Sequence, residues 1–245
     1  MLITTDASIY EIQPKKVVYP INKSDLINII RKLVLNKTCF TMRAGGTSIG
    51  GQAIGNGVIV DISKHLNSIF GFSQKNKEVS VEPGVIQDDL NDYLKLFNLK
   101  FAPDTSTSNR AMIGGMIGNN SCGSYSLLYG TTREHIKSVE AVLSNGDLVV
   151  FKELNGEELK NKLKLKTLEG DIYRYVINIL DKNQSEILEM FPDESLIRRN
   201  TGYALDVLIR RHQPFNGNGK RFNLTPLICG SECSGLTNLD TKIAL

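Results

Sequence analysis

The sequence predicts an α+β fold with two lobes: a small β-α-β lobe over about residues 14–80, and a larger lobe over about 81–245 with a mostly antiparallel sheet flanked by helices. Three observations predict this class. Short apolar runs enclose a helical stripe near the N-terminus, an alternating hairpin pattern lies in mid-chain, and amphipathic stripes flank that hairpin. At 245 residues the chain can bury a sizeable core, and we expect residues 1–245 to form a single domain.

The small lobe follows an irregular leader over residues 1–13. Val17–Pro20 is predicted to be a short strand, and Ser24 is predicted to be the N-cap of a helix. Apolar residues at helical spacing between Leu26 and Val34 give that helix a wide buried stripe. The apolar run at 38–42 is a second strand, which completes a compact β-α-β unit.

A glycine-rich stretch, Arg43–Gln52, leads from this strand to another predicted strand at 58–62. Its glycines allow the backbone to turn sharply and to bring several N–H groups together, and such concave nests bind phosphate oxygens. The dinucleotide fingerprint and the P-loop are different, because both lead from a strand into a helix. From this stretch alone, an anion-binding loop and a glycine-rich turn without a ligand are both open.

The larger lobe begins with a strand at 79–81 and an amphipathic helix over 86–97, for which Asn98 is the predicted C-cap. Residues 136–151 alternate as in a β-hairpin, and Asn145-Gly146 predicts a type I′ turn. The remaining predictions are a solvated helix or loop over 153–167, a helix over 171–180, and a helix over 184–191 that ends before Pro192.

A second informative stretch is uncharged and consists almost entirely of small side chains over residues 114–124. Small residues allow close approach of backbone to backbone, or allow a flat ligand to lie against the chain. Hydroxyl and amide groups in the same stretch supply hydrogen bonds without bulk. A tightly packed helix and loop without any ligand is the alternative at this point.

Composition excludes several classes of function. A net charge of +3, with no tryptophan and no dense basic stripe, argues against nucleic-acid binding. No apolar run approaches the ~20 residues of a membrane span, and residues 1–20 lack a signal-peptide core, so a cytoplasmic location is expected. The cysteines and histidines show no metal-binding spacing, so we expect free thiols and no metal site.

Five motifs follow one another along the chain. They are R-A-G-G-T-S-x-x-G-Q at 43–52, V-E-P-G at 81–84, A-P-D at 102–104, I-G-G-M-I-G-N-N-S-C-G at 113–123 with Y-G at 129–130, and R-N-T-G-Y-A-L at 199–205 followed by G-S-E at 230–232. In this order they resemble the FAD-binding domain of the vanillyl-alcohol oxidase/p-cresol methylhydroxylase flavoprotein superfamily. The branch most similar is that of the D-lactate, glycolate and D-2-hydroxyglutarate dehydrogenases, and the resemblance runs from about Val17 to Leu245.

The resemblance implies that FAD lies in the crevice between the lobes, with Ala44–Ser48 offering N–H groups and a hydroxyl to its pyrophosphate. It implies that Ile136 offers its backbone to the adenine. The cofactor-binding residues it implies are Arg43, Ala44, Gly45, Gly46, Thr47, Ser48, Gln52, Pro103, Asp104, Thr105, Gly114, Gly115, Asn120, Ser121, Gly123, Ser124, Gly130 and Ile136. Relatives that bond FAD covalently use a histidine in the glycine loop. This loop has none, so noncovalent FAD is expected.

The sequence departs from the family pattern in two places. Relatives usually continue G-S-E with G-T-L, whereas this chain has Cys233-Ser234-Gly235. Family dehydrogenases also carry a later substrate-binding domain whose histidines and arginines complete the active site, and this sequence ends at Leu245 before such a domain. A missing C-terminal domain or a partner subunit is therefore expected. The R-N-T-G-Y spelling is similar to large members with an iron–sulfur half, but the cysteine spacing of that half is absent here.

The resemblance implies a flavin-dependent oxidoreductase that takes a hydride from a small D-2-hydroxy acid of the lactate, glycolate or 2-hydroxyglutarate class, while a base removes the hydroxyl proton. No residue is assigned as that base. His65, His135 and His212 are each isolated in the sequence. Two roles remain open for Asn200 and Tyr203, which could face the flavin or could cap local structure. We expect the chain to bind FAD but to turn over hydroxy acids poorly by itself. A noncatalytic FAD-binding subunit and a glycine-rich protein without flavin are the alternatives.

Overall fold

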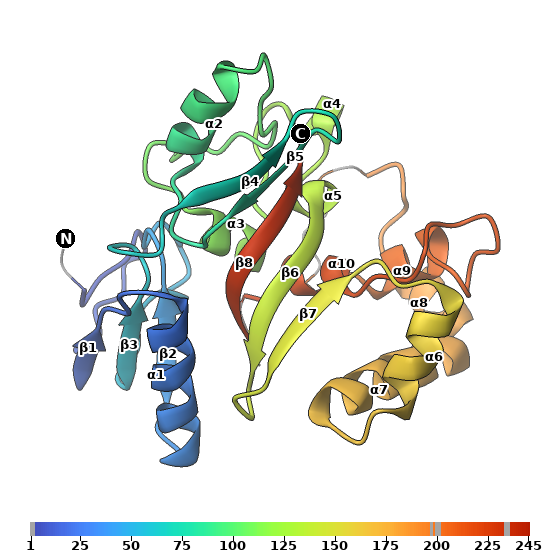
Figure 1. Cartoon of the computed structure of the whole chain (residues 1–245), viewed down its shortest axis with the longest axis horizontal. Coiled ribbons are helices and arrows are strands. Elements are labelled where there is room, and N and C mark those ends of the chain that lie inside the picture. The colour runs from blue at the N-terminus through green and yellow to red at the C-terminus, as the bar shows by residue number, and fades with distance from the viewer. Residues whose placement is uncertain (1–2, 197, 199–201, 233–235) are drawn as a thin grey trace.

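The computed structural model describes residues 3–196, 198, 202–232 and 236–245, and its strands form two sheets (Figure 1). The strands are β1 (Lys16–Val18), β2 (Phe40–Arg43), β3 (Val58–Asp61), β4 (Ile69–Ser73), β5 (Glu78–Val81), β6 (Ile136–Leu143), β7 (Leu148–Lys152) and β8 (Leu236–Ala244). One sheet is parallel in the order β1-β3-β2, and the other is antiparallel in the order β4-β5-β8-β6-β7. The predicted α+β class with a mostly antiparallel larger sheet is confirmed.

Ten helices occur in the described ranges. They are α1 (Lys23–Leu35), α2 (Gln87–Lys95), α3 (Ile113–Asn119), α4 (Ser126–Tyr129), α5 (Thr132–His135), α6 (Gly156–Lys164), α7 (Leu168–Lys182), α8 (Gln184–Met190), α9 (Leu205–Arg211) and α10 (Thr225–Ile228). The predicted helices α1, α2, α7 and α8 are confirmed within a few residues at their ends. In Figure 1, α6 to α8 lie on one side of the large sheet, away from α1 and the small sheet.

Helix α1 begins earlier than predicted. Its N-cap is Asn22, whose side chain accepts a hydrogen bond from the amide of Asp25 at 2.9 Å, so the prediction of Ser24 as the N-cap is wrong. Pro20 lies beyond the end of β1 because it has no N–H to give to the sheet. Leu26 and Ile30 of α1 then pack on Val58 and Val60 of β3, and this packing forms the core of the small lobe.

Helix α2 ends earlier than predicted. Its last residue is Lys95 and its C-cap is Leu96, so the prediction of Asn98 as the C-cap is wrong by two residues. Asn98 instead closes the turn that follows the helix. It has a φ of 55°, its amide donates to the carbonyl of Lys95 at 3.1 Å, and the amide of Leu99 donates to that of Leu94 at 3.2 Å. This pair of bonds around a left-handed residue is the Schellman pattern.

The hairpin of β6 and β7 is confirmed, but its turn is not of type I′. That type needs a positive φ at both central residues, and only Gly146 of the pair has one, at 85°. The amide of Leu143 donates to the carbonyl of Asp147 and the amide of Gly146 donates to that of Leu143, both at 2.9 Å. The turn is therefore a three-residue loop, Ser144 to Gly146, that ends in a bulge at Gly146. This bulge needs a left-handed residue, and glycine supplies it.

Two strands of the large sheet have no counterpart among the sequence predictions. β4 is interrupted by a bulge at Gly71, whose φ is 60°, and β8 lies centrally between β5 and β6. The chain passes from the parallel sheet to the antiparallel sheet between β3 and β4, before the predicted lobe boundary at residue 80. The reason is that β4 and β5 form a hairpin, and β5 pairs with β8 of the antiparallel sheet. The division into lobes and the single domain remain predictions.

Helix α1 also contacts the large sheet. Lys23 forms ion pairs with Glu140 of β6 and with Asp240 of β8, the latter at 2.8 Å, and Arg31 donates to the carbonyl of Gly146 at 2.9 Å. A bulge in β8 places two residues opposite one, because Val139 pairs with Thr241 and Ala141 with Asn238. The small lobe and the large sheet therefore share a polar junction along α1.

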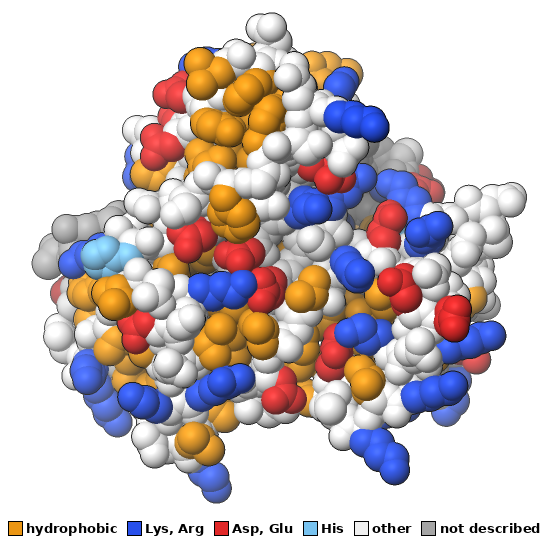
Figure 2. All heavy atoms as spheres, viewed as in Figure 1, with side chains coloured by type: hydrophobic (Ala, Val, Ile, Leu, Met, Phe, Trp, Pro, Cys, Tyr) orange, Lys and Arg blue, Asp and Glu red, His pale blue; other side chains and the backbone are white. Residues whose placement is uncertain are grey.

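The surface is mixed in charge. Acidic and basic side chains are interspersed over the face shown in Figure 2, and apolar side chains gather over α2 and β4 at its top. Helix α2 with the turn after it and β4 also contribute ring contacts among Phe72, Tyr93 and Phe97, with centroids 4.1–6.0 Å apart. Among the described residues, none of the helices has both the length and the apolar character to cross a membrane.

Candidate functional site

The two glycine-rich stretches meet at one cavity of about 510 Å³. The small lobe contributes the end of β2 and the loop after it, and the large lobe contributes α3 with the segments before and after it. The lining consists of Ala7, Met42, Arg43, Ala44, Gly45, Gly46, Thr47, Ser48, Ile49, Gln52, Ala53, Ile62, Pro83, Thr105, Ser106, Thr107, Ala111, Met112, Gly114, Gly115, Met116, Gly118, Asn119, Ser121, Cys122, Glu232 and Thr237. Its size is within the range of cofactor and ligand pockets.

Glycines allow the two walls to come together. A Cβ built on Gly45 would lie 2.2 Å from the carbonyl oxygen of Arg110, and one built on Gly114 would lie 2.7 Å from the Cβ of Pro83. Neither position tolerates a side chain without movement of the backbone opposite it. Gly115 faces the loop more loosely, since its Cβ would lie 3.5 Å from that of Ala44. The small-residue stretch is therefore a helix, α3, packed against the glycine loop.

The glycine loop presents backbone donors without partners. The N–H groups of residues 45–48 donate no hydrogen bond within the described part of the chain, although Gly45 and Gly46 are buried. The N–H of Gly115, in the first turn of α3, donates none there either. Buried backbone N–H groups are nearly always paired in folded proteins. A group of such donors around a cavity is the geometry of an anion site.

A buried cation lies directly below this loop. Arg43 is 1% exposed, and its Nη1 donates to the carbonyl of Ala53 at 3.0 Å, whereas its Nη2 has no partner among the described residues. A Cβ built on Gly46 would lie 2.4 Å from that Nη2. Gly46 also has a φ of 61°, so only glycine fits here without strain. The buried positive charge adds to the attraction of the N–H groups for an anion.

The structure brings eleven of the eighteen predicted residues to the cavity. They are Arg43, Ala44, Gly45, Gly46, Thr47, Ser48, Gln52, Thr105, Gly114, Gly115 and Ser121. The other seven do not line it: Pro103, Asp104, Asn120, Gly123, Ser124, Gly130 and Ile136. For all eighteen, contact with a cofactor remains a prediction.

Several of the seven link segments behind the cavity wall. Asp104 accepts hydrogen bonds from Ser124 Oγ at 2.7 Å and from the amide of Tyr125 at 2.9 Å. Burial acts to raise the pKa of Asp104, but these bonds outweigh it and hold the pKa below its ordinary value of 3.8. Asn120 is fully buried in a left-handed conformation, and its side chain accepts from Thr131 Oγ1 and from the amide of Arg133. Ile136 is the buried first residue of β6.

Sequence reasoning missed part of the lining. Ala7 comes from the leader that was expected to be irregular, and Ser106 and Thr107 follow the A-P-D motif without matching any pattern. Glu232 belongs to the quoted G-S-E motif, but was not among the predicted site residues. The amide of Glu232 donates to the carbonyl of Gly118 at 2.7 Å, which fixes the C-terminal segment on α3. No short-range signal marked Ala7, whose position is set by tertiary contact.

The second charged residue of the lining is Glu232, which is exposed. Gln52 Nε2 donates to Glu232 Oε1 at 3.3 Å, and both side chains are exposed. The predictions for Asn200 and for the Cys233-Ser234-Gly235 departure lie outside the described residues. Tyr203 is 50% exposed and does not line the cavity.

Other reactive side chains lie elsewhere. Cys39, Cys122 and Cys229 are free thiols, and burial raises the pKa of Cys229 to about 12. Cys122 lines the cavity. No group of three or more His, Cys, Asp or Glu residues in the described ranges could hold a metal ion, and the absence of a metal site remains a prediction. Both ring nitrogens of His135 contact backbone carbonyls, at 3.0 and 3.1 Å.

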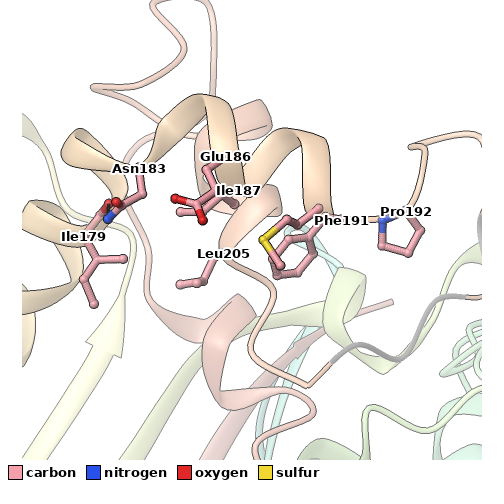
Figure 3. Close-up of a pocket in the computed structure, with 8 residues that line it drawn as sticks. Ile179, Asn183, Glu186, Ile187, Phe191, Pro192 and Leu205 are labelled. Carbon is pink, nitrogen blue, oxygen red and sulfur yellow. Dashed lines mark hydrogen bonds between the residues drawn. The ribbon is translucent and has the colours of Figure 1, made fainter.

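A second cavity of about 400 Å³ lies between α7, α8 and the start of α9 (Figure 3). Its walls are mainly apolar, with Ile179, Ile187, Phe191 and Leu205 directed toward it and Glu186 at its side. It contains none of the predicted site residues and no unpaired buried donor among the described side chains. The cavity between the glycine-rich stretches is therefore the candidate functional site.

Comparison with known proteins identifies relatives of the chain. Residues 14–152 match the family described as the FAD binding domain. The chain is 39% identical over 233 residues to a D-2-hydroxyglutarate dehydrogenase of Pantoea ananatis, covering 94% of this chain and 22% of that protein. It is 40% identical over 235 residues to a D-2-hydroxyglutarate dehydrogenase of Escherichia coli, covering 95% of this chain and 22% of that protein. It therefore spans less than a quarter of the length of these two relatives.

A solved structure shares the fold at low sequence identity. The alkyldihydroxyacetonephosphate synthase structure superposes with a TM-score of 0.60 and 13% identity, covering 93% of this chain and 30% of that one. At this identity the likeness concerns the fold alone. The two sheets and the helices around them are therefore an arrangement found in a known enzyme, and most of this chain takes part in it.

Proposed function

The chain belongs to the FAD binding domain family, and we propose that it is the FAD-binding part of an oxidoreductase that acts on a D-2-hydroxy acid. The observation that carries the proposal is the group of unpaired N–H donors at residues 45–48 beside the unpaired Nη2 of Arg43. The relatives of the chain, named as D-2-hydroxyglutarate dehydrogenases, support the substrate class. The cytoplasmic location is part of the same proposal.

The residues present fit FAD. Its pyrophosphate carries two negative charges, and the glycine loop supplies N–H donors and a buried guanidinium without a carboxylate partner. The α3 wall is uncharged and includes Gly114, Gly115 and Gly118, so a flat ring system finds little bulk at these positions. Because no histidine lies in residues 43–52, the proposed binding is noncovalent.

When bound, FAD supplies the two-electron acceptor for oxidation of the hydroxy acid to a 2-oxo acid. The N–H groups of residues 45–48 and the guanidinium of Arg43 would hold its pyrophosphate, and the lining residues of α3 would lie beside the rest of the cofactor. Among the described residues that line the cavity, the charged ones are Arg43 and Glu232, and we assign no catalytic base to either. Recognition of the substrate carboxylate is assigned to another domain or subunit, as in the sequence-based expectation.

The first test is uptake of FAD by the chain of 245 residues. We expect the purified protein to show flavin absorption bands, or to acquire them on incubation with FAD, and to bind ADP in competition with FAD. Oxidation of D-2-hydroxyglutarate, D-lactate and glycolate with an artificial electron acceptor should be slow. Absence of FAD binding in both the spectrum and a fluorescence titration would overturn the proposed function.

A variant locates the binding site. Gly115→Val places a branched side chain at the wall where a Cβ meets only Ala44, so the fold should tolerate it while the cavity narrows. We expect FAD affinity to fall by about tenfold or more, which corresponds to about 1.4 kcal/mol. Gly156→Ala, where a Cβ meets nothing within 4 Å, is the matched control and should leave affinity unchanged. Equal affinity in both variants would place FAD elsewhere.

A further inference from the structure

The N-terminal segment of residues 3–12 lies on the glycine loop as a strap. It is closed on itself by a bridge between Thr5 and Glu11 and by the amide of Ile12, which donates to the carbonyl of Thr4 at 2.9 Å. These residues precede the part of the chain that matches the FAD binding domain family, residues 14–152. The strap therefore has its own internal hydrogen bonds, and it lies next to the candidate site.

Three contacts hold the strap on the loop. The amide of Ala7 donates to the carbonyl of Ser48 at 3.0 Å, and Ala7 itself lines the cavity. A Cβ built on Gly51 would lie 3.2 Å from Cδ2 of Tyr10, so the ring of Tyr10 packs closely on the loop backbone. Ser48 Oγ donates to Asp6 Oδ2 at 2.6 Å.

Asp6 connects separate parts of the site. Its carboxylate accepts from Ser48 Oγ at 2.6 Å through one oxygen and from the amide of Ser8 at 2.9 Å through the other. Asp6 therefore ties the middle of the glycine loop, at Ser48, to the N-terminal strap. Asp6 is not among the lining residues, so it acts on the cavity only through these partners.

We propose that Asp6 is a positioning residue of the cofactor site, which fixes the glycine loop through Ser48 in the shape that presents its N–H groups. The proposal rests on the proposed function, since it concerns the same FAD site. A loop with glycines at 45, 46, 50 and 51 has many accessible backbone conformations, and the binding of an anion must otherwise order it. Anchoring the loop beforehand lowers that cost and so raises affinity.

The experiment compares FAD dissociation constants of the 245-residue chain and its variants, measured by flavin fluorescence, with the melting temperature of each cofactor-free protein as a second readout. Asp6→Ala removes both side-chain hydrogen bonds and should weaken FAD binding by about tenfold, as loss of a hydrogen bond to a charged group does. Asp6→Ser, too short to reach Ser48, should show the same loss. Asp6→Asn keeps an oxygen acceptor for Ser48 and should stay within about threefold of the parent.

A double-mutant cycle separates positioning from general stability. If Asp6 acts through Ser48, the FAD dissociation constant of the double variant Asp6→Ala, Ser48→Ala should lie within about twofold of that of Ser48→Ala alone. Asp147→Ala is the matched control, because this carboxylate lies at the tip of the β6–β7 hairpin, where it accepts a hydrogen bond from Asn145 Nδ2 at 2.7 Å. Asp147→Ala should leave FAD affinity unchanged, and its effect should be independent of Ser48→Ala.

The outcomes are distinct. Lack of FAD binding by the parent chain overturns the proposed function and the inference with it. Normal FAD binding by the parent, with equal affinity in Asp6→Ala or in Asp6→Ser, overturns the inference alone. A loss in the Asp6 variants that adds fully to that of Ser48→Ala also overturns it, because the two residues would then act independently. Weakened, non-additive binding with rescue by Asp6→Asn supports it.

Discussion

Gly46 is restricted both by its backbone conformation and by the space around it. Its φ of 61° is strained for any other amino acid, and a Cβ there would meet the Nη2 of Arg43 at 2.4 Å. The same close approach places the backbone of the loop directly over the buried guanidinium. Glycine is therefore required for the shape of the loop and for its close approach to Arg43, and the proposed site depends on both.

Gly46→Ala tests this double role. We expect the free energy of unfolding to fall by about 1–3 kcal/mol, since a left-handed alanine costs about 1–2 kcal/mol and the clash adds to it. FAD affinity should fall by about tenfold or more because Arg43 is displaced. Chemical denaturation and FAD titration measure the two effects, and Gly217→Ala, where a Cβ meets nothing within 4 Å, is the control. Retention of both stability and affinity would contradict this view of the loop.

At the scale of elements, helix α1 shows how a cap is chosen among neighbouring polar residues. Asn22 and Ser24 are both good N-cap types, and the sequence pattern favoured Ser24. In the structure Asn22 has an extended backbone and its side chain accepts from Asp25, while Ile21 donates to the carboxylate of Asp25 at 3.0 Å. The reciprocal bonds at Asp25 explain why the helix begins two residues earlier.

Two single substitutions distinguish these caps. Asn22→Ala should lower the free energy of unfolding by about 1 kcal/mol, because the first turn of α1 loses its side-chain acceptor. Ser24→Ala, now inside the first turn, should change it by no more than about 0.5 kcal/mol. Urea denaturation at equal protein concentration gives both values. A larger effect of Ser24→Ala than of Asn22→Ala would restore the prediction made from sequence.

For the whole molecule, the junction between the lobes depends on α1. Val142 and Leu239 of the large sheet belong to the same apolar cluster as Leu26 and Ile30, and Lys23 lies above this cluster between two carboxylates. Burial acts to lower the pKa of Lys23, but Asp240 and Glu140 outweigh it and raise the pKa above its ordinary 10.5. Its contribution to stability is therefore fully present below pH 10.5 and is lost as the pH rises through the higher folded-state pKa.

Lys23→Met measures this junction. The side chain of Lys23 is 35% exposed, so water screens its ion pairs and we expect a loss of only about 0.5–1 kcal/mol at low salt. The loss should shrink as salt is added and should stay constant between pH 6 and 9. Lys95→Met, whose pair with Asp92 is far more exposed, is the control. A loss independent of salt would show that packing of the lysine stem, rather than charge, holds the lobes together.

Sequence alone was sufficient for the class of fold, the helices α1, α2, α7 and α8, the hairpin and the family, because these depend on residue spacing and on motifs a few residues long. It also selected eleven residues that line the cavity. It did not give the place of β8 between β5 and β6, the edge strand β4, or the strap over the glycine loop. These features arise from pairing between residues far apart in the chain, as Glu78 with Ala244 or Asp6 with Ser48. Such partners are chosen by packing in three dimensions, which no local pattern encodes.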